Sequence, residues 1–409
     1  MRKLSNCTPE IRVKGYSDDW EQSKLGELCD IVGGGTPSTS ISEYWDGDID
    51  WYAPAEISDQ IYLSSSQRKI TEEGYNHSST KMLPRGTVLF TSRAGIGKTA
   101  ILSKEGCTNQ GFQSIVPHKN KLDSYFIFSR SNELKRYGEI VGAGSTFVEV
   151  SGKQMANMEL LMPKTLREQE EIGLYFSHLD HLITLHQQEY DRLICVKKAM
   201  LDKMFPQNGT NVPLVRFSEF TEPWILKPFT EIFKERHVID TISEEYPQLS
   251  FTIEEGVIRP EDKKTNKRDF LILDKENKKY LQTEYDDIIY NPANVIYGAI
   301  HRNALGKGCV SPIYKIFYTD QDSTFMECIV RHPRFINEIS RSMEGTVKKL
   351  KTLKPKAFLA MEAYIAPTLE EQKKIGELFT QLDKLIEIET MEVEKLKHIK
   401  SACLDKMFV

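Results

Sequence analysis

The sequence predicts a mixed α and β protein (α/β or α+β) in which two globular domains are separated by two long helices that form an antiparallel coiled coil. The first observation is an internal repeat, because residues 165–205 and 368–408 align without a gap and share about half of their residues. The second is that apolar residues in both copies alternate at spacings of four and three, the seam pattern of a coiled coil. The third is that a large block of short apolar runs precedes each copy. Together these observations indicate a pseudo-twofold molecule.

The repeat divides the chain into five parts. We expect a first domain at residues 1–162, a first helix at 163–205, a linker at 206–216, a second domain at 217–366 and a second helix at 367–409. The first block contains apolar runs at 86–92, 99–102, 111–116 and 158–162, which predict strands, and a predicted helix near 125–137. The second block predicts strands near 286–291, 295–300, 313–318 and 357–365, and a helix near 325–343. The run IGK (96–98) resembles LGK (305–307) and suggests equivalent loops.

Both helices begin with the pattern of a capping box, Thr165 with Glu168 and Thr368 with Glu371. Pro163 and Pro367 lie just upstream, and Pro206 ends the first helix. Each helix would be about 60 Å long. An amphipathic helix of this kind needs a partner, and the obvious partner is the other copy. The predicted helix-pairing residues are Ile172, Phe176, Leu179, Ile183, His186, Leu193, Ile375, Phe379, Leu382, Ile386, Glu389 and Leu396.

Polar residues interrupt the seam at His186 and Lys197 in the first helix, and at Glu389 and Lys400 in the second. His186 and Glu389 occupy equivalent positions near the middle of their helices. In an antiparallel pair with twofold symmetry, equivalent midpoints face each other across the axis. We therefore predict that the Glu389 carboxylate accepts a hydrogen bond from the His186 imidazole and fixes the register of the pair. The alternative is that both face solvent at the edge of the seam.

Composition sets limits on the class of protein. The net charge of −5 and the pI near 6.1 give no global attraction to nucleic acid, so any contact with DNA depends on local basic patches. Seven scattered cysteines without a CxxC pair favour a reducing cytoplasm over a disulfide framework or a zinc site. No signal peptide or membrane span is evident, so we expect a cytoplasmic protein.

Three catalytic motifs are only approximated. SRAGIGKT (92–99) resembles a phosphate-binding loop, but it has serine where the pattern requires glycine, and the residues that follow favour a strand over the required helix. Residues 260–262 and 276–278 have the spacing of a metal-dependent nuclease, but their flanks are strongly polar. NPAN (291–294) lacks the second proline and the aromatic residue of a methyltransferase tetrad. We therefore predict no catalytic residue, no metal and no cofactor bound by this chain.

Binding chemistry remains, because both blocks place basic and amide side chains near glycine-rich loops. Arginine can bind guanine through two hydrogen bonds, asparagine and glutamine can bind adenine, and lysine neutralises phosphate. Each side chain alone could be an ordinary surface residue, but as a set they favour nucleic acid. The candidates are Arg68, Lys69, Arg93, Lys98, Asn109, Gln110 and Gln113 in the first block, and His301, Arg302, Asn303, Lys307, Lys348, Lys349 and Lys351 in the second.

The chain from Trp20 to Phe408 resembles the specificity subunits of Type I restriction–modification enzymes. The resemblance rests on GGGTPS (33–38), YWDGDIDW (44–51), the run 83–102, NQGFQSI (109–115), and the P-x-L-x-EQ-x-x-I start of both helices, which has one extra residue in the first. It adds Thr36 and Ser38 to the candidate DNA-binding residues. The second domain lacks the GGTPS and NQGF patterns.

The resemblance implies that two target-recognition domains each read one half of a split double-stranded DNA site. It implies two modification (methyltransferase) subunits as partners, which use S-adenosylmethionine on adenine, and restriction subunits that use ATP and Mg for translocation and cleavage. The chain itself would then be a non-catalytic subunit in host defence against foreign DNA, without a membrane partner. The rival hypotheses are a stand-alone nuclease or methyltransferase and a purely structural coiled-coil protein.

Overall fold

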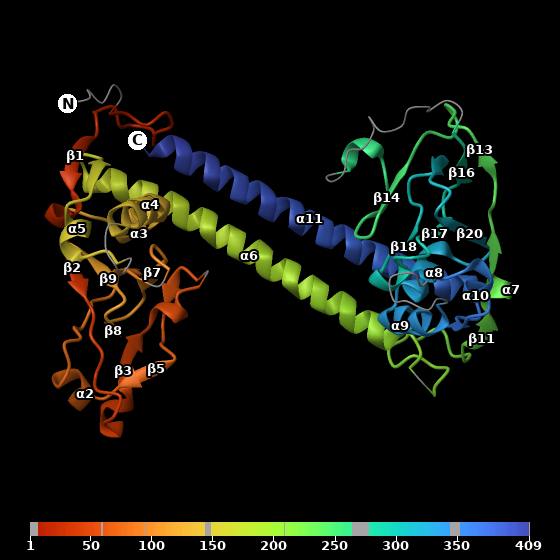
Figure 1. Ribbon diagram of the computed structural model, residues 1–409, viewed down its shortest axis with the longest axis horizontal. Coiled ribbons are helices and arrows are strands. Elements are labelled where there is room, and N and C mark those ends of the chain that lie inside the picture. The colour runs from red at the N-terminus through yellow and green to blue at the C-terminus, as the bar shows by residue number, and fades with distance from the viewer. Residues whose placement is uncertain are drawn as a thin grey trace. The chain divides into compact units, whose positions relative to one another are not determined.

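The computed structural model describes residues 7–58, 60–93, 95–143, 149–207, 209–263, 278–343 and 352–408. The chain forms two compact units, Met1–Gln187 together with Met391–Val409, and Gln188–Thr390. Both long helices contribute to both units. Helix α6 (Leu166–Met204) passes from the first unit into the second, and α11 (Leu369–Met407) passes from the second into the first. Each unit is described by itself below (Figure 1).

The first unit is built around a five-stranded sheet of order β2-β9-β6-β7-β4. Its strands are β2 (Cys29–Gly33), β9 (Gln113–Pro117), β6 (Val88–Phe90), β7 (Thr99–Leu102) and β4 (Tyr62–Leu63). Neighbours pair antiparallel, except β4 and β7, which are parallel. The run 86–92 forms a strand that is covered on both faces of the sheet, since Val88, Leu89 and Phe90 are all buried. Three of the four predicted strands of the first block are confirmed in this sheet, as β6, β7 and β9. The fourth, at 158–162, is also confirmed but belongs to a separate pair of strands.

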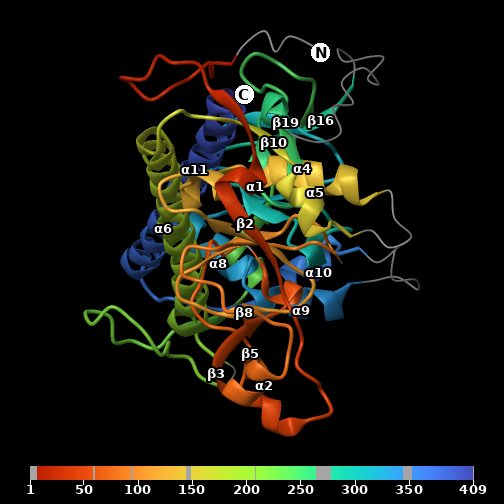
Figure 2. The ribbon, with the colours of Figure 1, turned by 90° about the vertical axis from the view of Figure 1, so that its left-hand side faces the viewer.

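A smaller three-stranded sheet of order β5-β3-β8 lies at the end of this unit remote from the long helices (Figure 1 and Figure 2). It consists of β3 (Trp45–Tyr52), β5 (Arg68–Ile70) and β8 (Cys107–Thr108), with α2 (Glu72–Asn76) beside it. At the other end, β1 (Glu21–Lys24), near the start of the domain, pairs antiparallel with β10 (Glu159–Met162), at its end. The remaining helices are α1 (Leu25–Leu28), α3 (Ser124–Ser129), α4 (Ser131–Gly142) and α5 (Gly152–Ala156).

The second unit repeats this plan with different residues. Its main sheet has the order β12-β20-β17-β18, beside a second sheet β13-β16-β19 and the pairs β11-β21 and β14-β15. The strands are β11 (Ile225–Pro228), β12 (Phe233–Glu235), β13 (Ile239–Asp240), β14 (Ser250–Thr252), β15 (Gly256–Ile258), β16 (Tyr280–Thr283), β17 (Ile288–Tyr290), β18 (Ile300–Arg302), β19 (Gly308–Val310), β20 (Lys315–Thr319) and β21 (Glu362–Ile365). The helices are α7 (Phe229–Ile232), α8 (Ser323–Val330), α9 (Pro333–Ser342) and α10 (Pro355–Leu359).

The sheet orders match β6 with β17, β7 with β18 and β8 with β19. This match corrects one comparison from the sequence. Gly97 lies in the loop between β6 and β7, whereas Gly306 lies in the turn between β18 and β19, so the IGK and LGK loops are not equivalent. Both glycines have positive φ, +93° and +118°. The likeness of the two sequences therefore reflects a shared need for glycine in a tight turn.

Three predictions for the second block were wrong in detail. Residues 295–300 were expected to form a strand, but Val295–Tyr297 form a short 3-10 helix and only Ile300 begins β18. The helix at 325–343 is broken at Pro333, which begins a new helix after its N-cap His332. The strand at 357–365 begins as the helix α10, with Pro355 at its first position, and becomes β21 only at Glu362.

The two long helices pack antiparallel within each unit. In the first unit, Ile172 and Phe176 near the start of α6 belong to one buried cluster with Met407 at the end of α11. In the second unit, Met204 at the end of α6 clusters with Ile375 and Phe379 near the start of α11. Figure 1 shows the two helices side by side in each unit. Seam residues Leu179 and Leu382 are also buried, as is Leu193, while Ile183, Ile386 and Leu396 are half-buried.

The lysines that interrupt the seam form cross-helix ion pairs. Lys400 Nζ lies 2.6 Å from Asp180 Oδ1 in the first unit, and Lys197 pairs with Asp383 in the second. The two pairs are equivalent in the repeat, so each lysine that interrupts the seam has an aspartate on the other helix as its partner. His186 and Glu389 are both half-buried, and their proposed hydrogen bond stays a prediction.

The capping-box glutamates have a different role from the one expected. The Thr165 hydroxyl accepts a hydrogen bond from the Glu168 amide at 3.3 Å, as predicted. The buried Glu168 carboxylate, however, accepts from Arg12 Nε at 2.7 Å and from Trp20 Nε1 at 3.2 Å. The second unit has the same arrangement, with Glu371 accepting from Arg216 and Trp224. Each glutamate therefore joins an arginine and a tryptophan near the start of its domain to the start of the long helix.

No helix among the described residues is long and apolar enough to cross a membrane.

Candidate nucleic-acid interface

A polar surface forms at the end of the first unit remote from the long helices, and two tryptophans hold it in place. Trp51 Nε1 donates a hydrogen bond to Gly35 O at 2.8 Å, and Trp45 Nε1 donates to Ser38 O at 3.1 Å. The two indoles meet edge to face with ring centroids 5.1 Å apart. Because these rings are buried in the sheet β5-β3-β8, they fix the loop that carries Thr36 and Ser38.

Arg68 lies over the same tryptophans. Its guanidinium carbon is 3.7 Å from the centroid of the Trp45 ring, and the side chain is exposed at the start of β5. Stacking on an indole restricts a long side chain while leaving its N–H donors available. Arg68 is therefore a pre-oriented donor on the surface.

The Asp50 carboxylate forms ion pairs with two neighbouring lysines. Its buried carboxylate accepts from Lys104 Nζ at 2.6 Å and from Ser66 N at 2.8 Å, and Lys69 Nζ lies 4.0 Å away. Burial alone would raise the pKa of Asp50, but the hydrogen bonds from Lys104 and Ser66 outweigh it and leave this pKa below the ordinary value. Lys69 thus lies beside an anion, with part of its charge already compensated.

The loop at Asn109 and Gln110 lies against the Thr36 loop. Thr36 Oγ1 donates to Gln110 Oε1, and Asn109 Oδ1 accepts from the Gly111 amide at 2.8 Å. A side chain at Gly34 would meet the carbonyl oxygens of Thr108 and Asn109 at 2.3 and 2.1 Å, so this close approach requires glycine. The structure therefore brings Thr36, Ser38, Asn109 and Gln110 together and places Arg68 over the tryptophans that hold this loop. Lys69 follows Arg68 in β5 and lies on the opposite face of the strand, beside Asp50.

The other three candidates of the first block lie on different segments. Arg93 bridges to Glu149 through the backbone, and Lys98 Nζ donates to Ile57 O at 3.2 Å. Gln113 begins β9 and is half-buried beside Gly33. The loop 92–98 is followed by the strand β7 and not by a helix, so it lacks the helix N-terminus that a phosphate-binding loop requires.

Two candidates of the second block are internal. His301 is 3% exposed, its Nε2 lies 2.7 Å from Ile253 O, and burial lowers its pKa to about 4, so the imidazole is neutral near pH 7. Asn303 is fully buried, where its amide donates to Glu284 O and Gly306 O and its Oδ1 accepts from the Leu305 amide. The expectation of direct DNA contacts is corrected at both positions, because their polar atoms face inward.

Arg302 and Lys307 are paired with carboxylates. Arg302 Nη1 lies 2.8 Å from Asp286 Oδ1, and its Nε lies 3.4 Å from Glu327 Oε2. Lys307 pairs with Glu245 and lies 5.4 Å from the Tyr246 ring centroid. Lys348, Lys349 and Lys351 lie outside the described residues.

A hollow of about 280 Å³ beside Lys307 adds residues that sequence reasoning missed. The exposed Arg259 and the half-buried Gln248 line it, together with Leu305 on the turn that Asn303 fixes. No local motif marks these positions, since segments about 50 residues apart meet only in the folded domain. Of the nuclease-like spacing, Glu276 and Asn277 lie outside the described residues. In the part of the chain that the structure describes, no group of three or more His, Cys, Asp or Glu residues is arranged to hold a metal ion.

Comparison with known proteins finds similar domains and chains. A family model described as the Type I restriction modification DNA specificity domain matches residues 17–193. The Type I restriction enzyme MjaIX specificity subunit of Methanocaldococcus jannaschii is 37% identical over 177 residues, which are 42% of this chain and 41% of that protein. The EcoR124I/EcoR124II specificity subunit of Escherichia coli is 28% identical over 190 residues, 42% of this chain and 46% of that protein. The matched region thus spans less than half the length of these two relatives.

Two further matches extend over nearly the whole chain. The MjaVIII specificity subunit of M. jannaschii is 23% identical over 415 residues, which are 95% of this chain and 92% of that protein. The crystal structure of the S subunit of a Type-I restriction-modification system from M. genitalium has the same fold, with a TM-score of 0.63 and 14% identity over 98% of this chain and 99% of that one. The predicted fold class is confirmed. Residues 17–193 match the Type I restriction modification DNA specificity domain, and the chain is similar to a Type I specificity subunit over 95% of its length.

Proposed function

We propose that the chain binds double-stranded DNA at a two-part sequence, with each domain reading one half, and directs adenine methylation and restriction by partner subunits. The observation that carries the proposal is the surface of the first unit described above. There Arg68 stacks on a buried indole. The Thr36 hydroxyl and the Gln110 amide are hydrogen-bonded to each other, and the buried Trp51 holds the Thr36 loop through Gly35. Fixed donors and acceptors of this kind are what base recognition in the major groove requires.

The chemistry would reside on the partners. Two modification subunits would supply S-adenosylmethionine-dependent methylation, and restriction subunits would supply ATP- and Mg-dependent translocation and cleavage. The paired halves of α6 and α11 provide long helical surfaces on which such subunits could dock. Exposed apolar residues on them, such as Leu182 and Leu385, are equivalent in the repeat.

The test is to map methylated adenine in DNA treated with the purified chain, with the modification subunit, and with both together. We expect methylation at one split sequence only when both are present. Methylation by the chain alone would contradict the proposed division of labour, and methylation by the partner alone at the same sites would contradict recognition by this chain.

A further inference from the structure

Each unit contains an aromatic cluster at the end of one long helix, and the two clusters are equivalent. A charged side chain packs beside the cluster of the first unit, whereas a hollow lies beside that of the second. In the first unit, Phe408 packs against Trp20, Phe126 and Phe176. In the second unit, Phe205 packs against Trp224, Phe325 and Phe379. These four pairs of rings, one from each unit, establish residue by residue which positions correspond around the end of each long helix.

Beside Phe408, the first unit places the guanidinium of Arg130. Its Nη1 donates to Leu161 O on β10 at 2.6 Å, and its Nε donates to Glu133 on α4 at 2.6 Å. Its guanidinium carbon lies 5.4 Å from the Phe408 ring centroid. Arg130 is only 2% exposed, so this charged group is buried with an aromatic ring, a carbonyl and a carboxylate around it. That set of partners satisfies both the planar face and the N–H edge of a guanidinium.

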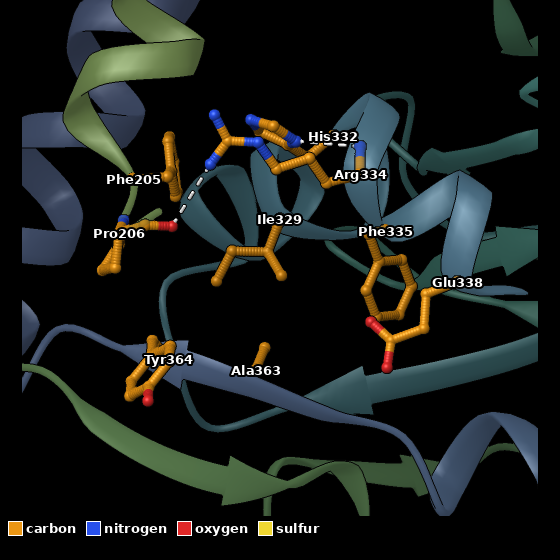
Figure 3. Close-up of a pocket in the computed structure, with 9 residues that line it drawn as sticks. All are labelled: Phe205, Pro206, Ile329, His332, Arg334, Phe335, Glu338, Ala363 and Tyr364. Atoms are coloured by element: carbon orange, nitrogen blue, oxygen red, sulfur yellow. Dashed lines mark hydrogen bonds between the residues drawn. The ribbon is translucent and has the colours of Figure 1, made fainter. Parts of the chain in front are cut away.

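In the second unit, Ile329 takes the place of Arg130. Each residue lies seven positions after the aspartate that caps its helix, Asp123 for α3 and Asp322 for α8. The shorter apolar side chain leaves a hollow of about 130 Å³ next to Phe205 (Figure 3). This volume is well above the roughly 10–15 Å³ that one water molecule needs. The hollow is lined by Phe205, Pro206, Ile329, His332, Arg334, Phe335, Glu338, Ala363 and Tyr364.

The lining offers the same kinds of group as the partners of Arg130 in the first unit, although the position of Glu133 is occupied by His332, whose ring centroid lies 6.1 Å from that of Phe205. Phe205 corresponds to Phe408, and Tyr364 of β21 corresponds to Leu161 of β10. Glu338, on α9, provides a carboxylate at the edge of the hollow (Figure 3). The two basic residues of the lining are accounted for. Arg334 pairs with Asp202 and its Nη1 lies 3.5 Å from Pro206 O (Figure 3). Burial lowers the pKa of His332, so its imidazole is neutral near pH 7.

We propose that this hollow binds an arginine side chain of a partner protein, which takes the place that Arg130 occupies in the first unit. The guanidinium would stack on Phe205 and donate to Glu338 and to the backbone carbonyl of Tyr364. Arginine is enriched at protein interfaces because it combines a stacking face with several donors. The identity of the partner as a subunit of the same complex rests on the proposed function, but the chemistry of the hollow does not.

The hollow itself is tested without any partner. The full chain carries ¹³C-labelled isoleucine δ-methyl groups, the Ile329 signal is identified by its loss in Ile329→Val, and N-acetyl-arginine amide is titrated. We expect a saturable shift of the Ile329 signal, with half-saturation on the order of millimolar for a ligand of this size. N-acetyl-lysine amide should give no saturable shift, since it lacks the planar face. Equal responses to both probes, or no response to the arginine probe, would overturn the proposal.

Two variants sharpen this test. Glu338→Gln should weaken the response to the arginine probe roughly tenfold, because a charge-assisted hydrogen bond is lost. In the first unit, Arg130→Ala should open an equivalent hollow, and methylguanidinium should restore the thermal stability lost by that variant. A Glu338→Gln response equal to that of the wild type would contradict the assigned partner, even if Arg130→Ala fails to fold.

The protein partner is tested in the assembled complex with p-benzoylphenylalanine at position 364. We expect a cross-link to an arginine-containing peptide of another subunit. Replacing that arginine with lysine should remove most of the cross-linked product. No cross-link, or one to a peptide without arginine, would overturn a protein partner. DNA methylation by the same complex is measured in parallel, so a failure of the proposed function is seen separately.

Discussion

At the residue scale, the structure separates side chains that face outward from those that hold the fold. Arg68 and Asn303 illustrate the difference. Arg68 is exposed and stacked on Trp45, so its guanidinium is held in place with its donors available. Asn303 is buried and bonded to the backbone of its own turn, so it positions Leu305 and Gly306.

Arg68→Ala should weaken binding of the assembled complex to its DNA by about 1–3 kcal/mol, the range for one arginine at a base edge. Trp45→Leu should have a similar effect, because Arg68 then loses its stacking surface. Arg136→Ala, an exposed arginine on α4, is the matched control and should leave affinity unchanged. Fluorescence anisotropy at one fixed salt concentration measures all three. Equal losses for Arg68→Ala and Arg136→Ala would remove Arg68 from the interface.

The second unit should lose stability on acidification because of His301. Its folded pKa, about 4, lies below the roughly 6.5 of an unfolded histidine, so the unfolded state binds more protons between these values. Stability therefore falls as pH drops from about 6.5 toward 4, by on the order of 3 kcal/mol at most. His301→Gln should reduce this slope, whereas His237→Gln, at an exposed position, should not. His332, whose pKa burial also lowers, would maintain part of the slope. Urea unfolding across this pH range gives the slopes, and unchanged slopes would contradict the assignment.

At the element scale, the cross-helix ion pairs are alike in sequence but differ in surroundings. Asp180 is 7% exposed and also accepts a hydrogen bond from Tyr125 at 2.8 Å. The side chain of Asp383 is 55% exposed. A buried carboxylate that loses its partner remains poorly solvated, whereas an exposed one is solvated by water.

Lys400→Met should therefore destabilise the first unit by about 2 kcal/mol, since it leaves the Asp180 carboxylate buried with only Tyr125. Lys197→Met should change the second unit by less than about 1 kcal/mol. Hydrogen exchange followed by mass spectrometry reports each unit separately through its own peptides. Equal effects in the two units would show that burial of the carboxylate does not decide the contribution of the pair.

At the scale of the whole molecule, the two long helices have the same length and the same seam pattern, while the loops of the two domains differ. The glutamate that joins each domain to its helix recurs with its arginine and tryptophan. The loop carrying Thr36 and Ser38 has no sequence counterpart in the second domain. This pattern fits the proposal that one common framework carries two domains that read different DNA half-sites.

Replacing residues 20–162 with the corresponding domain of a relative should change one half of the methylated sequence and leave the other intact. The physical reason is that the interface residues of the first unit are fixed by contacts within its own domain. Genome-wide mapping of methylated adenine checks the result. A simultaneous change in both halves would show that the domains do not read DNA independently.

Adding one heptad to both α6 and α11 lengthens each helix by about 10 Å. The seam stays nearly in phase, because seven residues differ from whole helical turns by only about 20°. If the helices set the separation of the half-sites, the unread spacer should grow by roughly three base pairs while both half-site sequences persist. The same mapping of methylated adenine detects this change. Full activity on the original spacing would show that helix length does not determine the spacer.

The sequence alone determined the long helices, because heptad spacing, prolines and caps are local signals that survive without knowledge of the fold. It also determined the strands of the first block, such as β6 and β7, whose apolar runs are bounded by glycine. Only the tertiary structure decided which polar residues face outward. His301 and Asn303 read as binding residues in the sequence, but the sheet encloses them, and burial depends on neighbours that are remote in the chain. The structure likewise gave Lys197 and Lys400 their aspartate partners, and it brought Arg259 to Lys307, because such contacts arise only when separate segments pack together.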